Sequence, residues 1–68
     1  MEVKVLTYKL KAKRVEKGIK QSDLAKLLGI SRQSLSDIEH RRIEPRRDLM
    51  LKIADALNED VSILFFNE

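Results

Sequence analysis

The chain contains no cysteine, one histidine, one proline and two glycines among its 68 residues. Without cysteine it can form neither a disulfide nor a thiolate metal site, and it has no cysteine nucleophile. The lone histidine, His40, cannot build a metal cage. So few turn residues argue against a domain of many β-strands. No apolar run approaches the roughly 20 residues of a membrane span, and no secretory leader is recognisable, so we expect a cytoplasmic protein without a membrane partner.

Aliphatic and charged residues dominate the composition. Hydrophobic residues make up 43% and charged residues 37% of the chain, whereas aromatic residues make up only 4%. Abundant Ala, Leu, Lys and Glu favour helices. No linker, repeat or low-complexity segment divides the sequence, so we expect one small domain over residues 1–68.

Charge is distributed unevenly along the chain. Residues 1–20 carry seven basic and two acidic side chains, whereas residues 48–68 carry one basic and five acidic ones. A basic front and an acidic tail suit a polyanionic partner on one face. Ordinary solvated charge explains the count equally well.

Hydrophobic periodicity and capping residues predict four short helices. These cover residues 8–17, 21–28, 32–40 and 47–57. Thr7 and Ser31 are N-cap candidates, and Gly18, Gly29 and Asn58 are expected to end helices. Alternation in residues 1–6 is a weak strand signal, and residues 61–66 can be assigned to neither helix nor strand. The pattern predicts a compact all-α fold.

The stretch Gln21–His40 carries the most specific pattern. Only three residues separate its two helices, so the helices must cross steeply, as in a helix-turn-helix. Ala25 falls where the helices touch, and Gly29 falls where a positive φ is needed. A plain helical hairpin is the alternative. The apolar residues expected to face the core are Leu24, Leu28, Ile30, Leu35 and Ile38. Leu27 belongs with Leu24 and Leu28 to the i, i+3, i+4 apolar stripe of the second predicted helix.

The chain resembles the lambda-repressor-like, Cro/repressor (XRE) helix-turn-helix family of bacterial and phage transcription regulators. The matching segments are AKRVEKGIKQSDLAKLLGISRQSLSDIE, then Pro45, LKIADALN and the closing ILF, so the likeness covers about residues 10–65. It implies a compact five-helix domain, a third helix placed in the major groove, and a homodimer on a palindromic operator.

Four residues depart from the family pattern. Arg41 replaces a common glycine after the third helix, so we expect a tighter or differently wound exit there. Arg46 replaces the usual small N-cap of the fourth helix, and Arg47 replaces an apolar residue. Glu59 also replaces an apolar residue, so we expect altered packing of the last turn.

The third predicted helix has a polar face opposite Leu35 and Ile38. The first turns of a helix that enters a major groove meet base edges. There Arg can bond guanine, Gln can bond adenine, and a carboxylate can accept from cytosine N4 or repel phosphate at wrong sites. An ordinary exposed polar face is the alternative. We therefore expect base readout by Arg32, Gln33, Ser36 and Asp37.

Two groups of residues are candidates for contacts to the DNA backbone. Lys20 and Gln21 begin the second helix, where free backbone N–H groups favour a phosphate, although Gln21 can equally be a simple cap. The second group can contact phosphates or insert one arginine into a narrowed minor groove, Arg46 being favoured by the resemblance, unless it is merely a solvated charge run. Its members are His40, Arg41, Arg42, Arg46 and Arg47.

The resemblance also implies an ion pair between Arg14 and Glu39 that fixes the reading helix, with Arg14 lending one guanidinium edge to a phosphate. Two independent surface charges are the alternative.

The C-terminal residues 61–66 hold more apolar side chains than so small a monomer can bury. The resemblance places Leu64 and Phe65 inward. We expect a dimer interface formed by Val61, Ile63 and Phe66. An optional two-stranded β element would pair residues 2–5 with residues near Phe66.

Taken together, the residues and the resemblance predict a sequence-specific DNA-binding transcriptional regulator of bacterial or phage type, with repression favoured. It is expected to act as a homodimer on double-stranded DNA, in the cytoplasm and associated with the nucleoid. The alternative is an antitoxin-like or anti-repressor interaction module on the same fold, which glutamates in place of Arg32 and Gln33 would have favoured. An enzyme is disfavoured because no nucleophile–base pair, metal cluster or glycine-rich phosphate loop is present. We expect no cofactor, metal or small-molecule ligand.

Overall fold

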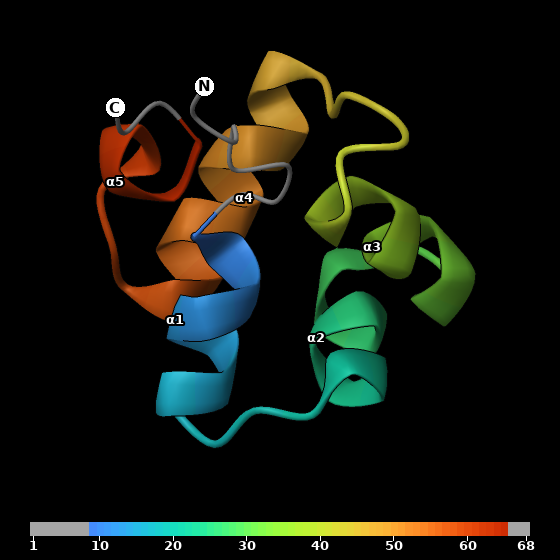
Figure 1. Ribbon diagram of the computed structural model, residues 1–68, viewed down its shortest axis with the longest axis horizontal. Helices are drawn as coiled ribbons and strands as arrows, with labels where there is room; N and C mark the ends of the chain where they lie inside the picture. The colour runs from blue at the N-terminus through green and yellow to red at the C-terminus, as the bar shows by residue number, and fades with distance from the viewer. Residues whose placement is uncertain (1–8, 66–68) are drawn as a thin grey trace, which may run out of the picture.

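The computed structural model describes residues 9–65, which form five α-helices joined by short loops (Figure 1). The helices are α1 (Leu10–Glu16), α2 (Gln21–Leu28), α3 (Arg32–Glu39), α4 (Arg47–Leu57) and α5 (Val61–Phe65). The expected all-α class is thereby confirmed, and residues 9–65 contain no strand. The N-cap role of Thr7 and the β element between residues 2–5 and Phe66 lie outside the described residues.

The helix boundaries follow the capping residues closely. The helices α2 and α4 begin and end where the sequence predicts, and α3 ends one residue early, at Glu39. In contrast, α1 begins at Leu10 rather than at residue 8. Gly29 and Asn58 end their helices in the left-handed conformation, with φ of 75° and 56°. Helices α2 and α3 are therefore only eight residues long, and α4 is eleven residues long.

The residue that leads the chain out of α3, Arg41, has a left-handed backbone conformation although it is not a glycine. Its φ is 59°, a conformation that glycine takes at little cost. A non-glycine residue in this region is disfavoured by roughly 1–2 kcal/mol. The backbone around it is closed by hydrogen bonds from Arg41 N to Ile38 O (3.0 Å) and from Arg42 N to Asp37 O (2.8 Å).

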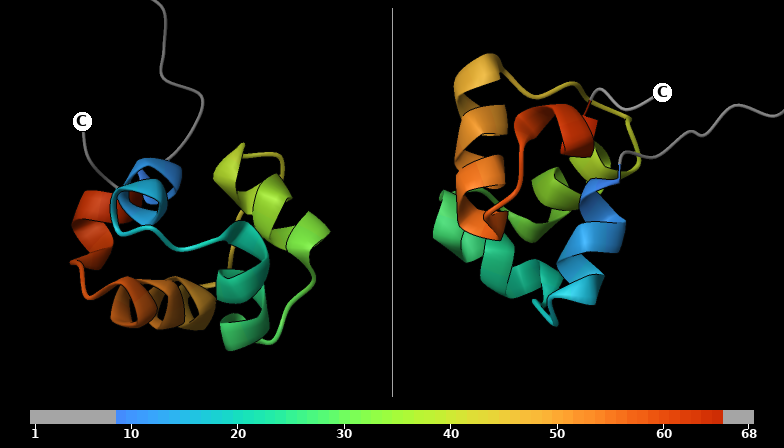
Figure 2. Two further views of the ribbon diagram at one scale, coloured as in Figure 1. Left: turned by 90° about the horizontal axis from the view of Figure 1, so that it is seen from below. Right: turned by 90° about the vertical axis from the view of Figure 1, so that its left-hand side faces the viewer.

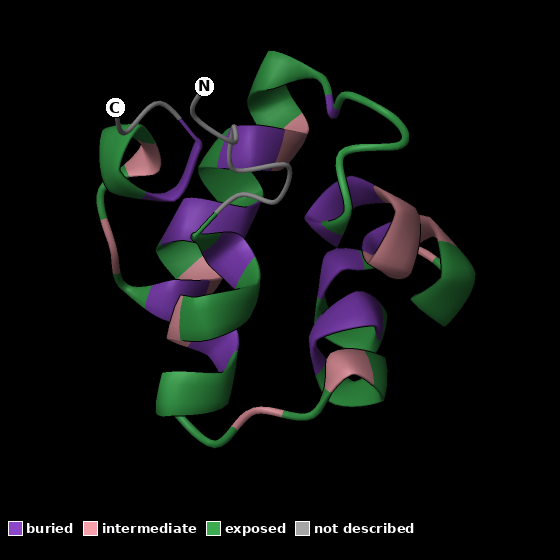
Figure 3. Cartoon of the chain, viewed as in Figure 1, coloured by how far each residue is buried: buried purple, intermediate pink, exposed green. Residues whose placement is uncertain are grey.

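One hydrophobic core unites the helices (Figure 3). The fully buried side chains come from each helix in turn, and Leu10, Leu35, Ile53 and Leu64 are all 0% exposed. The expected apolar face of α4 is buried along its whole length: Met50, Ile53, Ala54 and Leu57. Ala25 is buried where α2 meets the rest of the core, as its small size predicts.

Leu27 is an exception, since its periodicity places it in one apolar stripe with Leu24 and Leu28, yet it is 71% exposed. Successive residues turn about 100° around a helix. Leu24 and Leu28 therefore share a side with Ala25, and Leu27 lies beyond the edge of that side. Because α2 turns Ala25 rather than Leu27 inward, the predicted stripe was placed too far to one side.

The last helix, α5, packs against α1 and α4. Leu64 and Phe65 are buried, as the resemblance implied. Glu59 does not disturb this packing, because its carboxylate turns to one lysine of α1 and to the lysine that directly follows α1. Glu59 Oε2 lies 3.4 Å from Lys17 Nζ and 3.9 Å from Lys13 Nζ. At Glu59 itself a charge pair takes the place of the apolar contact of the family pattern, while Leu64 and Phe65 remain buried.

The helix-turn-helix pair and the C-terminal helix lie on opposite sides of the molecule. Figures 1 and 2 show α2 and α3 together on one side of the molecule and α5 on the other, with α1 and α4 between them. No helix in the described part of the chain is long and apolar enough to cross a membrane.

Candidate nucleic-acid interface

A three-residue turn fixes the angle between α2 and α3. Gly29 N donates to Lys26 O at 3.1 Å and Ile30 N donates to Ala25 O at 3.0 Å, which satisfies the last carbonyls of α2. Ser31 then caps α3: its Oγ accepts from Ser34 N at 3.0 Å and donates to Ser34 Oγ at 2.9 Å. The turn and the cap together determine where the first residues of α3 lie.

The helix α3 has a buried face and a polar face. Leu35, Ile38 and Glu39 are buried, with exposures of 0%, 2% and 0%. Arg32 and Gln33 are exposed in the first turn. Of the other predicted base readers, Ser36 and Asp37 are half-buried and lie one turn further on. The first turn of α3 is thus the part of the helix that a partner can reach most freely.

A buried ion pair connects α3 to α1. Arg14 Nε donates to Glu39 Oε2 at 2.7 Å, and Arg14 Nη2 donates to Glu39 Oε1 at 3.3 Å. Arg14 Nη1 also donates to the carbonyl of Ile19, at 2.8 Å. Because Arg14 and Glu39 are 7% and 0% exposed, the two charges depend on each other for compensation. The alternative of two independent surface charges does not describe these residues.

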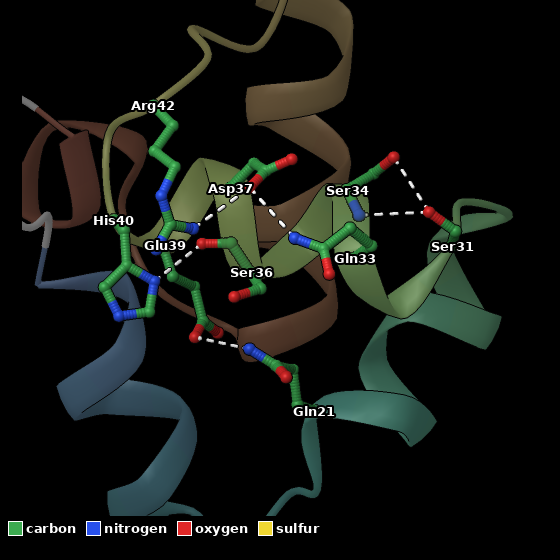
Figure 4. A network of polar contacts seen from close by, with 9 residues as sticks. All are labelled: Gln21, Ser31, Gln33, Ser34, Ser36, Asp37, Glu39, His40 and Arg42. Atoms are coloured by element: carbon green, nitrogen blue, oxygen red, sulfur yellow. Dashed lines mark hydrogen bonds and ion pairs between the residues drawn. The ribbon is translucent and has the colours of Figure 1, made fainter.

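Gln21 joins this ion pair from the first residue of α2. Its Nε2 donates to Glu39 Oε1 at 3.0 Å (Figure 4). The side chain is therefore not a simple cap, and α2 has no side-chain cap hydrogen bond from Lys20. Glu39 consequently binds side chains of α1 and α2 at once, which fixes α3 against both helices.

Asp37 binds two of the other predicted contact residues. Its Oδ1 accepts from Gln33 Nε2 at 3.1 Å and from Arg42 Nη1 at 3.0 Å (Figure 4). The i, i+4 spacing of Gln33 and Asp37 is a signal for such a bond that the sequence already carries. The contact with Arg42 depends on the path of the loop after α3, which the sequence does not reveal.

Basic side chains come just before α2, in the segment that joins α3 to α4 and at the first residue of α4. Lys20, Arg41, Arg42, Arg46 and Arg47 are all exposed. His40 is exposed at the C-terminal end of α3, where its Nδ1 donates to the Ser36 carbonyl at 2.8 Å. Among residues 9–65 no group of three or more acidic or histidine side chains is placed to hold a metal ion.

The steep pair α2 and α3, with a glycine turn, a serine cap and a polar outer face, defines a helix-turn-helix domain. The helix-turn-helix family model matches residues 10–64. The chain belongs to this family, as its resemblance to the lambda-repressor-like regulators indicated. The family is one of DNA-binding regulators and not of enzymes.

Two proteins of similar sequence carry names from gene control. The chain is 44% identical over 59 residues to an ImmF control region 10 kDa protein of Bacillus phage phi105. That alignment covers 87% of this chain and 66% of the phage protein, so the chain spans just under two thirds of that relative. It is also 38% identical over 60 residues to an uncharacterised helix-turn-helix-type transcriptional regulator of Methanocaldococcus jannaschii, covering 88% and 91% of the two chains.

Solved structures show the same fold. The P22 c2 repressor in complex with a synthetic operator superposes with a TM-score of 0.84 over 97% of this chain and 100% of that one, at 24% identity. The clp gene regulator ClgR from Corynebacterium glutamicum superposes with a TM-score of 0.75 at 30% identity, covering 78% and 56% of the chains. The first likeness, at so low an identity, concerns the fold alone.

Proposed function

We propose that this protein is a sequence-specific DNA-binding transcriptional regulator that acts on double-stranded DNA in the cytoplasm. Repression is the proposed mode of regulation. The observation that carries the proposal is the exposure of Arg32 and Gln33 on the first turn of α3, a helix held from behind by Leu35, Ile38 and Glu39. Membership of the helix-turn-helix family and the M. jannaschii relative, which is named a transcriptional regulator, support the same role.

The proposed contacts fall into two classes. Arg32, Gln33 and Ser36 read base edges when α3 enters a major groove, because their positions on the first turns suit that docking. The backbone contacts come from exposed or half-buried groups around α3, with Arg46 in the minor groove: Lys20, Gln21, His40, Arg41, Arg42, Arg46 and Arg47. Arg14 uses three of its five N–H groups for Glu39 and Ile19, so a phosphate contact would use the second N–H of Nη1 or Nη2.

Replacement of Arg32 tests the reading role. Arg32→Ala should cost about 1–3 kcal/mol of binding free energy on the preferred site and relax preference at one base pair. Lys20→Ala is the matched control, since a lost phosphate contact weakens all sequences alike and lowers the slope of log K against log salt by about one unit. Titrations of both variants on specific and random duplexes check this. Equal losses on the two duplexes for Arg32→Ala would remove it from the base readers.

We further propose that the protein acts as a homodimer on a palindromic operator, through the surface formed by α5 and the first half of α4. A hollow of about 390 Å³ lies there, lined by Met50, Leu51 and Val61 together with Glu44 and Arg47. Leu51 of α4 and Ile63 of α5 are exposed apolar side chains, at 51% and 39%. Because α5 lies across the molecule from α3, a twofold axis here leaves both reading helices free, at the roughly 34 Å spacing of one DNA turn (Figure 1).

A charge placed in this surface should separate the protomers. Ile63→Glu is expected to give a folded monomer with weakened operator binding, because burying an unpaired carboxylate in an interface is costly. Ser62→Glu adds the same charge at the neighbouring exposed position of α5 and serves as the control. Sedimentation near the wild-type dissociation constant reports the state. An Ile63→Glu protein that remains dimeric places the interface elsewhere. Phe66, the third expected interface residue, lies outside the described residues.

A further inference from the structure

Asp37 stands out on the polar face of α3 because it is an acid on a surface proposed to meet DNA. A free carboxylate there would repel the phosphate backbone. Asp37 is not free: its Oδ1 receives hydrogen bonds from Gln33 Nε2 and Arg42 Nη1, and its side chain is 26% exposed. The ion pair with Arg42 offsets the negative charge of the carboxylate. The other contact of the carboxylate is the hydrogen bond from Gln33.

The carboxylate fixes the orientation of the Gln33 amide. An ionised carboxylate only accepts hydrogen bonds, so it binds the amide nitrogen and repels the amide oxygen. Gln33 Nε2 therefore faces Asp37, and Oε1 is turned away from it (Figure 4). An exposed glutamine without such a neighbour can exchange these two ends by rotating its last torsion.

With its amide held in this orientation, Gln33 can offer a DNA base one N–H hydrogen and the oxygen Oε1. The amide nitrogen carries two hydrogens, of which one is bound to Asp37. The other hydrogen and Oε1 form a donor–acceptor pair, which matches the N7 acceptor and N6 donor of adenine. Guanine presents two acceptors, O6 and N7, and so offers no donor to Oε1. Rotation of the amide, which would bring both hydrogens toward guanine, breaks the bond to Asp37.

We propose that Asp37 is a specificity-determining positioning residue, which acts through Gln33 to select adenine over guanine at one base pair. This inference rests on the proposed function, since it assumes that α3 reads DNA. It replaces direct readout of cytosine as the role of Asp37. Arg42 supports it by holding the same carboxylate oxygen from the loop after α3.

The test uses the full chain and the preferred duplex with each single-base variant. Gln33→Ala identifies the base pair that Gln33 reads. Asp37→Ala should then lose adenine-over-guanine preference at that same pair by about tenfold, the effect of about 1.4 kcal/mol. In the Gln33→Ala background, Asp37→Ala should change no base preference. A preference altered in that background, or at another pair, shows direct readout by Asp37 and overturns the proposal.

Asp37→Asn separates geometry from charge. It keeps an acceptor oxygen for Gln33 but removes the negative charge, so adenine preference should be largely retained while affinity for all sequences rises. If Asp37→Asn loses the preference as completely as Asp37→Ala, the positioning mechanism is contradicted. Thermal unfolding of each variant shows that it remains folded at the temperature of the binding assay.

A measurement without DNA keeps the two hypotheses apart. In the wild-type protein the two Nε2 protons of Gln33 should have clearly different NMR shifts, and in Asp37→Ala they should move toward those of an exposed glutamine. No such movement overturns the positioning role. A wild-type protein with this signature but no preference for any duplex contradicts the proposed function instead.

Discussion

Replacing Glu39 by alanine should lower the free energy of unfolding by about 3–5 kcal/mol. The change leaves the guanidinium of Arg14 without its carboxylate, at a position only 7% exposed, and takes the acceptor from Gln21. A buried charge without compensation is far more costly than a missing surface contact. Since small domains are stable by only about 5–15 kcal/mol, the loss is a large part of the total. Denaturant titration followed by circular dichroism measures it.

Two further substitutions serve as controls: one at Arg14, the partner of Glu39, and one in the surface pair of Lys13 and Glu16. Arg14→Ala should cost a similar amount, because Glu39 is then stranded at 0% exposure. The double variant should lose less than the two single losses together, since neither charge is left alone. Glu16→Ala breaks the exposed contact with Lys13 (3.4 Å) and should change stability by less than about 1 kcal/mol. Strict additivity of Arg14→Ala and Glu39→Ala would show that the pair contributes nothing.

Truncating Leu64 should lower the free energy of unfolding by about 2–5 kcal/mol. Leu64 is 0% exposed and comes from a helix of only five residues, so few other contacts can compensate for the cavity. So short a helix has little stability of its own and depends on packing. We therefore expect Leu64→Ala to release α5 from α1 and α4 as well as to weaken the core. Denaturant titration gives the loss, and hydrogen exchange of the α5 amides reports the release.

The adjacent residue is the matched control for this prediction. Ile63 belongs to the same helix and is 39% exposed, so Ile63→Ala should change monomer stability by no more than about 0.5 kcal/mol. Its effect is expected in the association of two chains instead. If Leu64→Ala and Ile63→Ala cost the monomer the same, the inward position of Leu64 is wrong.

Local signals in the sequence were sufficient for most of the helices and for the turn between α2 and α3. Gly29, Ser31 and Asn58 act through their own backbone or a partner three residues away, and such short-range preferences can be identified without knowing the fold. The family motif added the pairing of Arg14 with Glu39, residues 25 positions apart.

Other features depend on how the helices meet. Leu27 has the same periodicity as a core leucine, and only the packing of α2 through Ala25 leaves it exposed. Arg41 takes a left-handed conformation because the loop after α3 requires it, against the residue's own preference. Glu59 lies on a loop, and its contacts with Lys13 and Lys17 exist only because α5 brings that loop back to α1.

The sequence by itself determined an all-α helix-turn-helix chain with Arg32 and Gln33 on the outer face of its third helix, because helix periodicity and caps are local properties. The tertiary structure alone decided that Gln21 joins Arg14 on Glu39 and that Arg42 joins Gln33 on Asp37. Such contacts depend on the relative positions of separate helices and loops. These positions result from burial of the whole core, which no single segment specifies.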